Sequence, residues 1–333
     1  MDKCNIIDNR SRFTRLSFSN HKKSYVINEL VTCLYYKQRD KALHWTAEML
    51  CSLYVLDLWK LYIGFYCKHI HIHNVKIPLY LLKKFTEFKS IHTTIKNDHD
   101  ARNNDDIRNI FFTITIILCE TKNENVLCIM PFVFALDNMY DNLKANNVEY
   151  IKPFFKDGDP TEYYIPLNEF VYHISITKDT TCLFYWVDWL VEYDIYLFKK
   201  KKQLFIQYRT FIDFNNELKN KNIIWLLWDI ILHYSKSTKD IIKQTINSLL
   251  ELFKIKYKMS NNKTYKCIIY LAINLIVTSG INTNIKLIEN TQLFHNLYNN
   301  TQIIFEEIKK KEVCIKEPIS EKQKLYDSVY KIS

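Results

Sequence analysis

The chain has 333 residues, 48% of them hydrophobic, a formal net charge of +10 and only three glycines, Gly64, Gly158 and Gly280. The hydrophobic share is enough for a packed core, so the composition excludes a disordered protein. The isolated glycines exclude P-loop, dinucleotide-binding, nucleophile-elbow and EF-hand motifs, because those loops need glycine where the backbone takes a positive φ or approaches a ligand closely.

The first third of the chain is predicted to change from a flexible segment to helices. Residues 1–22 are polar and show no periodicity, so we expect a flexible N-terminal segment. From Tyr25 to Trp59, apolar residues recur at steps of three and four, which is typical of helices with one buried face. The acidic residues at the end of 98–106 are suited to cap a helix over 107–119, because their oxygens accept hydrogen bonds from its first amides.

The remainder of the chain is predicted to consist of a linker followed by helices. Residues 144–168 hold three of the six prolines and Gly158, which is typical of a linker or a long loop. Apolar periodicity then predicts helices at 182–200, 222–234, 239–255 and 285–311. The apolar run from Cys267 to Val277 is too short to span a bilayer and predicts a further, buried helix.

Strict period-two alternation is nearly absent, so the predicted fold is all-α, either a helical bundle or an irregular array of helical repeats with two helical lobes. The expected divisions are a flexible segment at 1–22, an N-terminal helical lobe at 23–143, a linker or long loop at 144–168, a C-terminal helical lobe at 169–318 and a tail at 319–333. The sequence leaves open whether 144–168 separates two domains.

The cysteines and the N-terminus bear on the compartment. The nine cysteines are irregularly spaced and none forms a CxxC pair, which favours reduced thiols in the cytoplasm or nucleus. The first residues carry charge where a signal peptide carries an apolar stretch, so we expect no secretion and no membrane partner.

The segment CKHIHIH carries the metal candidates Cys67, His69, His71 and His73. Thiolate and imidazole are the usual zinc ligands, and on a strand the three histidines would share one face. The alternative interpretation is that the isoleucines of this segment lie in the core with surface histidines between them. Because no second group of ligands follows at zinc-like spacing, we predict no metal and no cofactor.

Asp188 and Glu192 lie four residues apart on one predicted helix. Paired carboxylates can perform acid–base chemistry or hold a divalent cation, but they more commonly form the solvated face of a helix. No serine, cysteine or threonine stands in a recognisable nucleophile context, so we predict no catalytic residue.

Four lysines follow at the end of that helix, and they are the predicted contact residues for nucleic acid or a protein partner together with Arg209: Lys199, Lys200, Lys201 and Lys202. The alternative is that they complement the helix dipole. The chain has 39 lysines but only seven arginines, which is what an AT-rich genome encodes, so the net charge by itself is weak evidence for nucleic-acid binding.

Residues 35–85 resemble the helical region that follows the ATPase module in the MgsA/Werner-helicase-interacting family, relatives of clamp loaders. The shared elements are Lys41-Ala42-Leu43, Trp45, Glu48, Leu58-Trp59 and the turn from Asn74 to Pro78. Since the ATPase motifs are absent, the resemblance implies a helical collar or an oligomerisation element near replication machinery. The chain is also similar in style to proteins of nucleocytoplasmic large DNA viruses, most clearly in YWVDWLVEYD at 185–194.

We therefore predict a non-enzymatic viral protein that binds nucleic acid or replication proteins in the host cytoplasm or nucleus, or in the virion. The alternative is a structural or assembly protein that packs with other virion or host proteins through surfaces rich in Trp and Tyr. A third hypothesis is a metal-dependent enzyme that uses the three histidines or the Asp188/Glu192 pair. The oligomeric state stays open.

Overall fold

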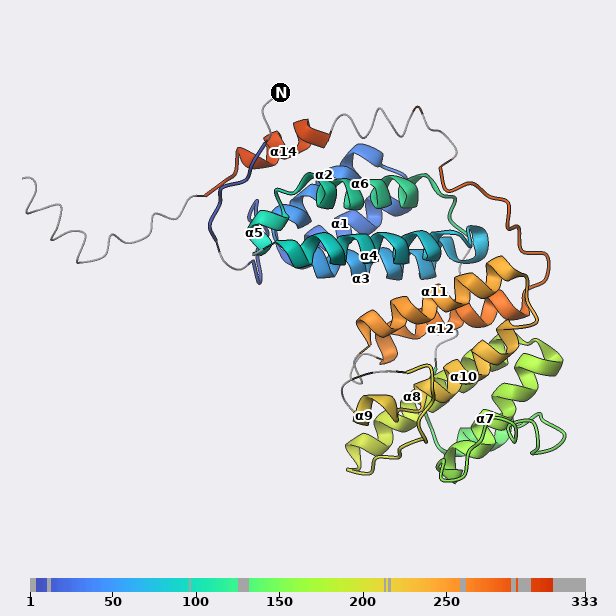
Figure 1. Ribbon diagram of the computed structural model, residues 1–333. Coiled ribbons are helices and arrows are strands. Elements are labelled where there is room, and N and C mark those ends of the chain that lie inside the picture. The colour runs from blue at the N-terminus through green and yellow to red at the C-terminus, as the bar shows by residue number, and fades with distance from the viewer. Residues whose placement is uncertain are drawn as a thin grey trace, which may run out of the picture. The chain divides into compact units, whose positions relative to one another are not determined.

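The computed structural model describes residues 4–10, 13–95, 97–124, 132–212, 214, 217–257, 262–288, 292 and 301–313 (Figure 1). These residues form helices and no β-sheet, which confirms the all-α prediction. Within them, no helix combines the length and the apolar surface that crossing a bilayer requires. The predicted tail at 319–333 lies outside the described residues.

The chain forms two compact units, each assembled from segments far apart in sequence. Unit 1 comprises Met1–Trp59, Glu87–Cys119 and Asn290–Ser333, and unit 2 comprises Lys60–Thr86 and Glu120–Glu289. The predicted linker at 144–168 therefore falls inside unit 2. Its Asp159 is buried, and its Pro166 lies within helix α7 (Tyr164–Tyr172).

Unit 1 is a helical bundle that both ends of the chain complete. Its helices are α1 (Lys23–Tyr35), α2 (Arg39–Cys51), the start of α3 (Val55–Phe65), the end of α4 (Ile77–Thr94), α5 (Asp98–Ala101), α6 (Asp105–Glu120) and α14 (Thr301–Lys309). Helix α2 packs against α1 and against α14 (Figure 1). The rings of Trp59, Phe88 and Phe111 meet in the core with centroids 5.3–5.8 Å apart.

Two local predictions for unit 1 need correction. The residue that caps α6 is Asn104, whose side-chain oxygen accepts a hydrogen bond from Ile107 N at 3.0 Å, and the acids that follow it belong to the helix itself. The helix predicted at 285–311 is shorter than expected. Residues 285–288 are not helical, and α14 begins at Thr301.

Unit 2 is built around one buried helix. Its helices after α7 are α8 (Thr180–Lys199), α9 (Glu217–Asn220), α10 (Ile224–Ser235), α11 (Asp240–Lys256) and α12 (Asn262–Val277). Helix α12 packs against α8, α10 and α11, and its residues 267–275 are all buried. A helix that is apolar on every side needs such surroundings, so the buried helix predicted at 267–277 is confirmed.

Candidate functional site

The CKHIHIH segment changes helix type in its middle, and this change separates its side chains. Helix α3 runs on into the π-helix η1 (Tyr66–Ile70), and the 3₁₀ helix η2 (His71–His73) follows. His71, at the junction, has a φ of 54°, in the region that L-residues rarely adopt. Cys67 and His71 are buried, whereas the other two histidines are half-buried.

The two buried side chains find partners on helix α12. The thiol of Cys67 is hydrogen-bonded to that of Cys267. Nε2 of His71 lies 3.5 Å from the amide nitrogen of Asn274. Burial lowers the pKa of His71 to about 4, so the imidazole is neutral at neutral pH.

The half-buried histidines point to other partners. Nδ1 of His73 lies 3.4 Å from the carboxylate of Glu124, and the ring of His69 lies against Phe65 with centroids 4.9 Å apart. The structure thus does not bring the four metal candidates together. In the described part of the chain, no three His, Cys, Asp or Glu side chains are placed to share a metal ion.

Asp188 is not on a solvated helix face. Its carboxylate is buried and accepts hydrogen bonds from the ammonium of Lys266 and the hydroxyl of Tyr270, both on α12. Glu192 is half-buried one turn later. The ammonium of Lys266 therefore neutralises Asp188 where α8 packs against α12, and the hydroxyl of Tyr270 adds a hydrogen bond, which is the arrangement of a structural ion pair.

The predicted lysine run forms an exposed end to α8. All four lysines are exposed, and none forms an ion pair with the described residues. Lys201 has a φ of 57°, and the N–H groups of Lys200 and Lys202 donate to carbonyls of the last helical turn at 3.1 and 2.9 Å. This left-handed cap ends the helix and fixes the backbone of the run.

Aromatic rings lie on the same helix just before the lysines. Trp189, Tyr193 and Tyr196 follow one another at helical spacing, with centroids 4.8 and 6.4 Å apart and nearly parallel planes. Phe134 packs against all three rings. The tyrosines are half-buried, and Phe198 is 68% exposed. We call Phe198 and Lys199–Lys202 the α8 tip.

Arg209 is not part of this exposed surface, although it was predicted with the lysines. It is 1% exposed, its Nη2 lies 2.7 Å from the carboxylate of Asp159, and its Nε lies 3.1 Å from that of Asp229. Its Nη1 also donates to the carbonyl of Gln207 at 2.8 Å. The guanidinium joins the loops at Asp159 and Gln207 to Asp229 on α10, so of the five predicted contact residues the four lysines remain available to a ligand.

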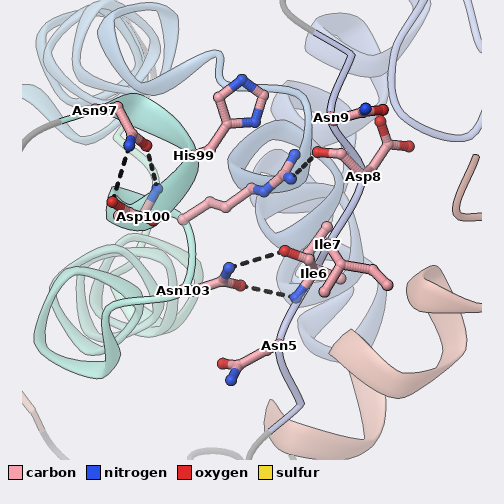
Figure 2. A pocket seen from close by; sticks show the side chains of 10 residues that line it. Asn5, Ile6, Ile7, Asp8, Asn9, Asn97, His99, Asp100 and Asn103 are labelled. Carbon is pink, nitrogen blue, oxygen red and sulfur yellow. Dashed lines mark hydrogen bonds between the residues drawn. The ribbon is translucent and has the colours of Figure 1, made fainter. Parts of the chain in front are cut away.

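Unit 1 has an open pocket that the sequence did not indicate. It has a volume of about 750 Å³ and is lined by residues 5–9 on one side and by Asn97, His99, Asp100, Arg102 and Asn103 on the other (Figure 2). The residues expected to form a flexible segment are thus one wall of a polar site. The only signal for it was the alternation of Cys4, Ile6 and Asp8 with polar or exposed neighbours, which is too short to separate from chance.

Comparisons of the chain with protein-family models, with curated proteins and with solved structures found no match. The candidate sites therefore rest on their own geometry.

Proposed function

We propose that the protein binds single-stranded nucleic acid through the α8 tip. The observation that carries the proposal is a run of four exposed lysines that form no ion pair with the described residues, on a backbone fixed by a left-handed cap and directly after an exposed phenylalanine. Lysines neutralise phosphates and release their counterions, while exposed rings stack on unpaired bases. The replication or virion proteins implied by the sequence resemblance stay a prediction.

The aromatic neighbours favour a single strand over a duplex. In a duplex the bases are already stacked on one another, so a protruding ring such as Phe198 has no base face to cover. Tyr193 and Tyr196 are half-buried two turns and one turn before the lysines, respectively. Lys200 already lies near such a ring, with its Nζ 5.7 Å from the Tyr196 centroid.

Fluorescence anisotropy with labelled oligothymidylate, titrated with salt, tests the charge contribution. The fourfold Lys→Gln variant at 199–202 removes up to four phosphate contacts, so the slope of log K against log salt should decrease by about 3, at about 0.7 per contact. The matched control carries the same charge change at four other exposed lysines of unit 2: Lys83, Lys236, Lys239 and Lys243. The proposal is contradicted if the salt slope decreases equally in both variants. It is also contradicted if the unmodified protein does not bind the oligonucleotide at low salt.

Phe198→Ala tests the stacking contribution separately. Loss of one stacked base costs about 1–3 kcal/mol, so single-strand affinity should fall at least fivefold while the salt slope stays the same. Ile176→Ala, at another exposed apolar residue of unit 2, is the control and should bind normally. A variant that weakens duplex and single-strand binding equally would show that Phe198 does not read unpaired bases.

A further inference from the structure

Unit 1 contains a second candidate site, which does not involve the α8 tip. Residues 4–8, which we call the N-terminal segment, alternate between buried and exposed side chains, the pattern of an extended strand. Cys4, Ile6 and Asp8 are 6%, 2% and 1% exposed, whereas Ile7 is 65% exposed. The segment lies between two helical walls, as a central strand lies between its neighbours.

The first wall comes from α5 and α6 (Figure 2). The side-chain amide of Asn103 both donates to the carbonyl of Ile6 and accepts from its N–H, each at 2.9 Å. This is the pair of hydrogen bonds that an adjacent antiparallel strand would supply. Arg108 donates to the carbonyl of Cys4 at 3.0 Å, and Arg102 donates to the carbonyl of Asp8.

The second wall is the end of α14 and the residues after it. The carboxylate of Glu312 accepts hydrogen bonds from the N–H groups of Ile7 and Asp8. The ammonium of Lys309 donates to the carbonyl of Asn5 at 2.6 Å. Both walls therefore bind the main chain of the segment, mostly through charged side chains, whose hydrogen bonds are stronger than neutral ones.

At Ile6 and Asp8 the segment depends on a particular side chain. Ile6 fills an apolar position, and the carboxylate of Asp8 accepts from the backbone of Val313 at 3.0 Å and from its own neighbour Arg10. Main-chain bonds give affinity for any extended peptide, and pockets for alternate side chains give specificity. A site of this kind recognises a short motif, an aliphatic residue followed two positions later by aspartate.

We propose that the groove between these two walls is a peptide-binding site, that the N-terminal segment is its resident ligand, and that an extended segment of a partner protein with the aliphatic-x-Asp motif replaces it. Two observations favour exchange. The bonds of the resident segment go to backbone groups that every peptide has. The 750 Å³ pocket lies open beside it.

The test uses the full-length protein and a fluorescent peptide with the sequence of residues 4–10. The resident segment competes with the peptide at a high effective concentration, so the unmodified protein should bind it weakly. Ile6→Ala weakens the resident segment by removing a buried side chain, and should tighten peptide binding roughly tenfold or more. Ile7→Ala changes the same residue type at the exposed neighbouring position and should leave peptide affinity at the unmodified level.

The motif and the groove are tested in the same assay. A peptide with Asn at the position of Asp8 should bind the Ile6→Ala protein at least tenfold more weakly, and adding Asn103→Ala to that protein should abolish binding. Circular dichroism checks that each variant is folded. No peptide binding to a folded Ile6→Ala protein, or equal affinity for the Ile7→Ala protein, overturns the proposal.

Hydrogen exchange on the unmodified protein keeps the proposal falsifiable if Ile6→Ala does not fold. Saturating peptide should speed exchange of the resident Ile7 and Asp8 amides, because they lose the carboxylate of Glu312 when the segment leaves. Unchanged exchange of these amides at saturating peptide contradicts displacement.

Discussion

Arg108 in unit 1 and Arg209 in unit 2 are both almost fully buried, but the two units satisfy them differently. Arg209 contacts two carboxylates, those of Asp159 and Asp229. Arg108 donates to the carbonyls of Arg102 and Cys4 and to the amide of Asn103, and its guanidinium carbon lies 3.8 Å from the ring centroid of Phe305. Burial accordingly lowers the pKa of Arg108, because its bonding partners are uncharged.

Arginine fills buried positions that lysine does not fill in this lysine-rich chain. Three of the seven arginines, at 102, 108 and 209, are at most 2% exposed, and no lysine among the described residues is buried. A guanidinium presents five donors on three nitrogens in a planar fork, so it can reach acceptors on different sides of the group, which the single nitrogen of an ammonium cannot. Unit 1 uses this fork to bind main chain, and unit 2 uses it to join carboxylates.

The largest effect is expected where unit 2 relies on opposite charges. Asp159→Ala leaves the guanidinium of Arg209 without its closest carboxylate and two backbone amides without their acceptor. Removing one partner of a buried ion pair costs about 3–5 kcal/mol of unfolding free energy. Urea unfolding measures the loss, and exposed Asp157→Ala, two residues away, is the control that should change by less than about 0.5 kcal/mol.

The second-largest effect is a pH dependence of stability that comes from His71, whose imidazole is buried in unit 2 in its neutral form. Its unfolded pKa is near 6.5, whereas burial holds the folded value at about 4, so the unfolded chain binds the proton first. Its stability contribution is complete above pH 6.5 and declines as the pH falls towards 4, by about 3 kcal/mol in all.

Unfolding of the protein and of His71→Asn across this pH range measures the contribution. The unfolding free energy of the variant should decrease less steeply as the pH falls. Burial also lowers the pKa of His44 and His173, so part of the slope should remain. An unchanged slope in the variant would show that His71 protonates as readily in the folded protein as in the unfolded one.

The smallest effect is expected for Arg108→Lys, which keeps the charge and loses the fork. The ammonium cannot serve both carbonyls and the amide of Asn103, so unsatisfied acceptors should cost about 2 kcal/mol. Arg15→Lys, at an exposed position, is the matched control. If the two variants have the same thermal midpoint, a positive charge at position 108 is sufficient to stabilise unit 1 and the guanidinium fork is not needed.

The positions of most helices could be predicted because buried apolar residues recur every three or four residues along a helix. The helices at 182–200, 222–234 and 239–255 agree within two residues with α8, α10 and α11. At 285–311, spaced apolar residues continue into a stretch whose first residues are not helical. The assembly of unit 1 from three separate stretches was not predictable, because helical periodicity contains no information on which helices pack together.

Exposed site residues could be predicted from the sequence. Buried ones could not, because their bonding partners come from distant segments of the chain. The lysines at 199–202 are exposed, as expected of a charged run at a helix end. Arg209 looked equivalent in sequence, but Asp159, fifty residues earlier, buries it. Likewise, the thiol of Cys67 is hydrogen-bonded to that of Cys267 on α12, two hundred residues later, and is not grouped with its neighbouring histidines.

The two walls of the N-terminal segment are made at very different times. Ile7 and Glu312 are hydrogen-bonded although 305 residues separate them. At typical rates of translation, Glu312 leaves the ribosome about 15 to 60 seconds after Ile7. During that interval the segment has at most its first wall, so each new copy of unit 1 passes through a stage in which the second wall of the groove has not yet been made.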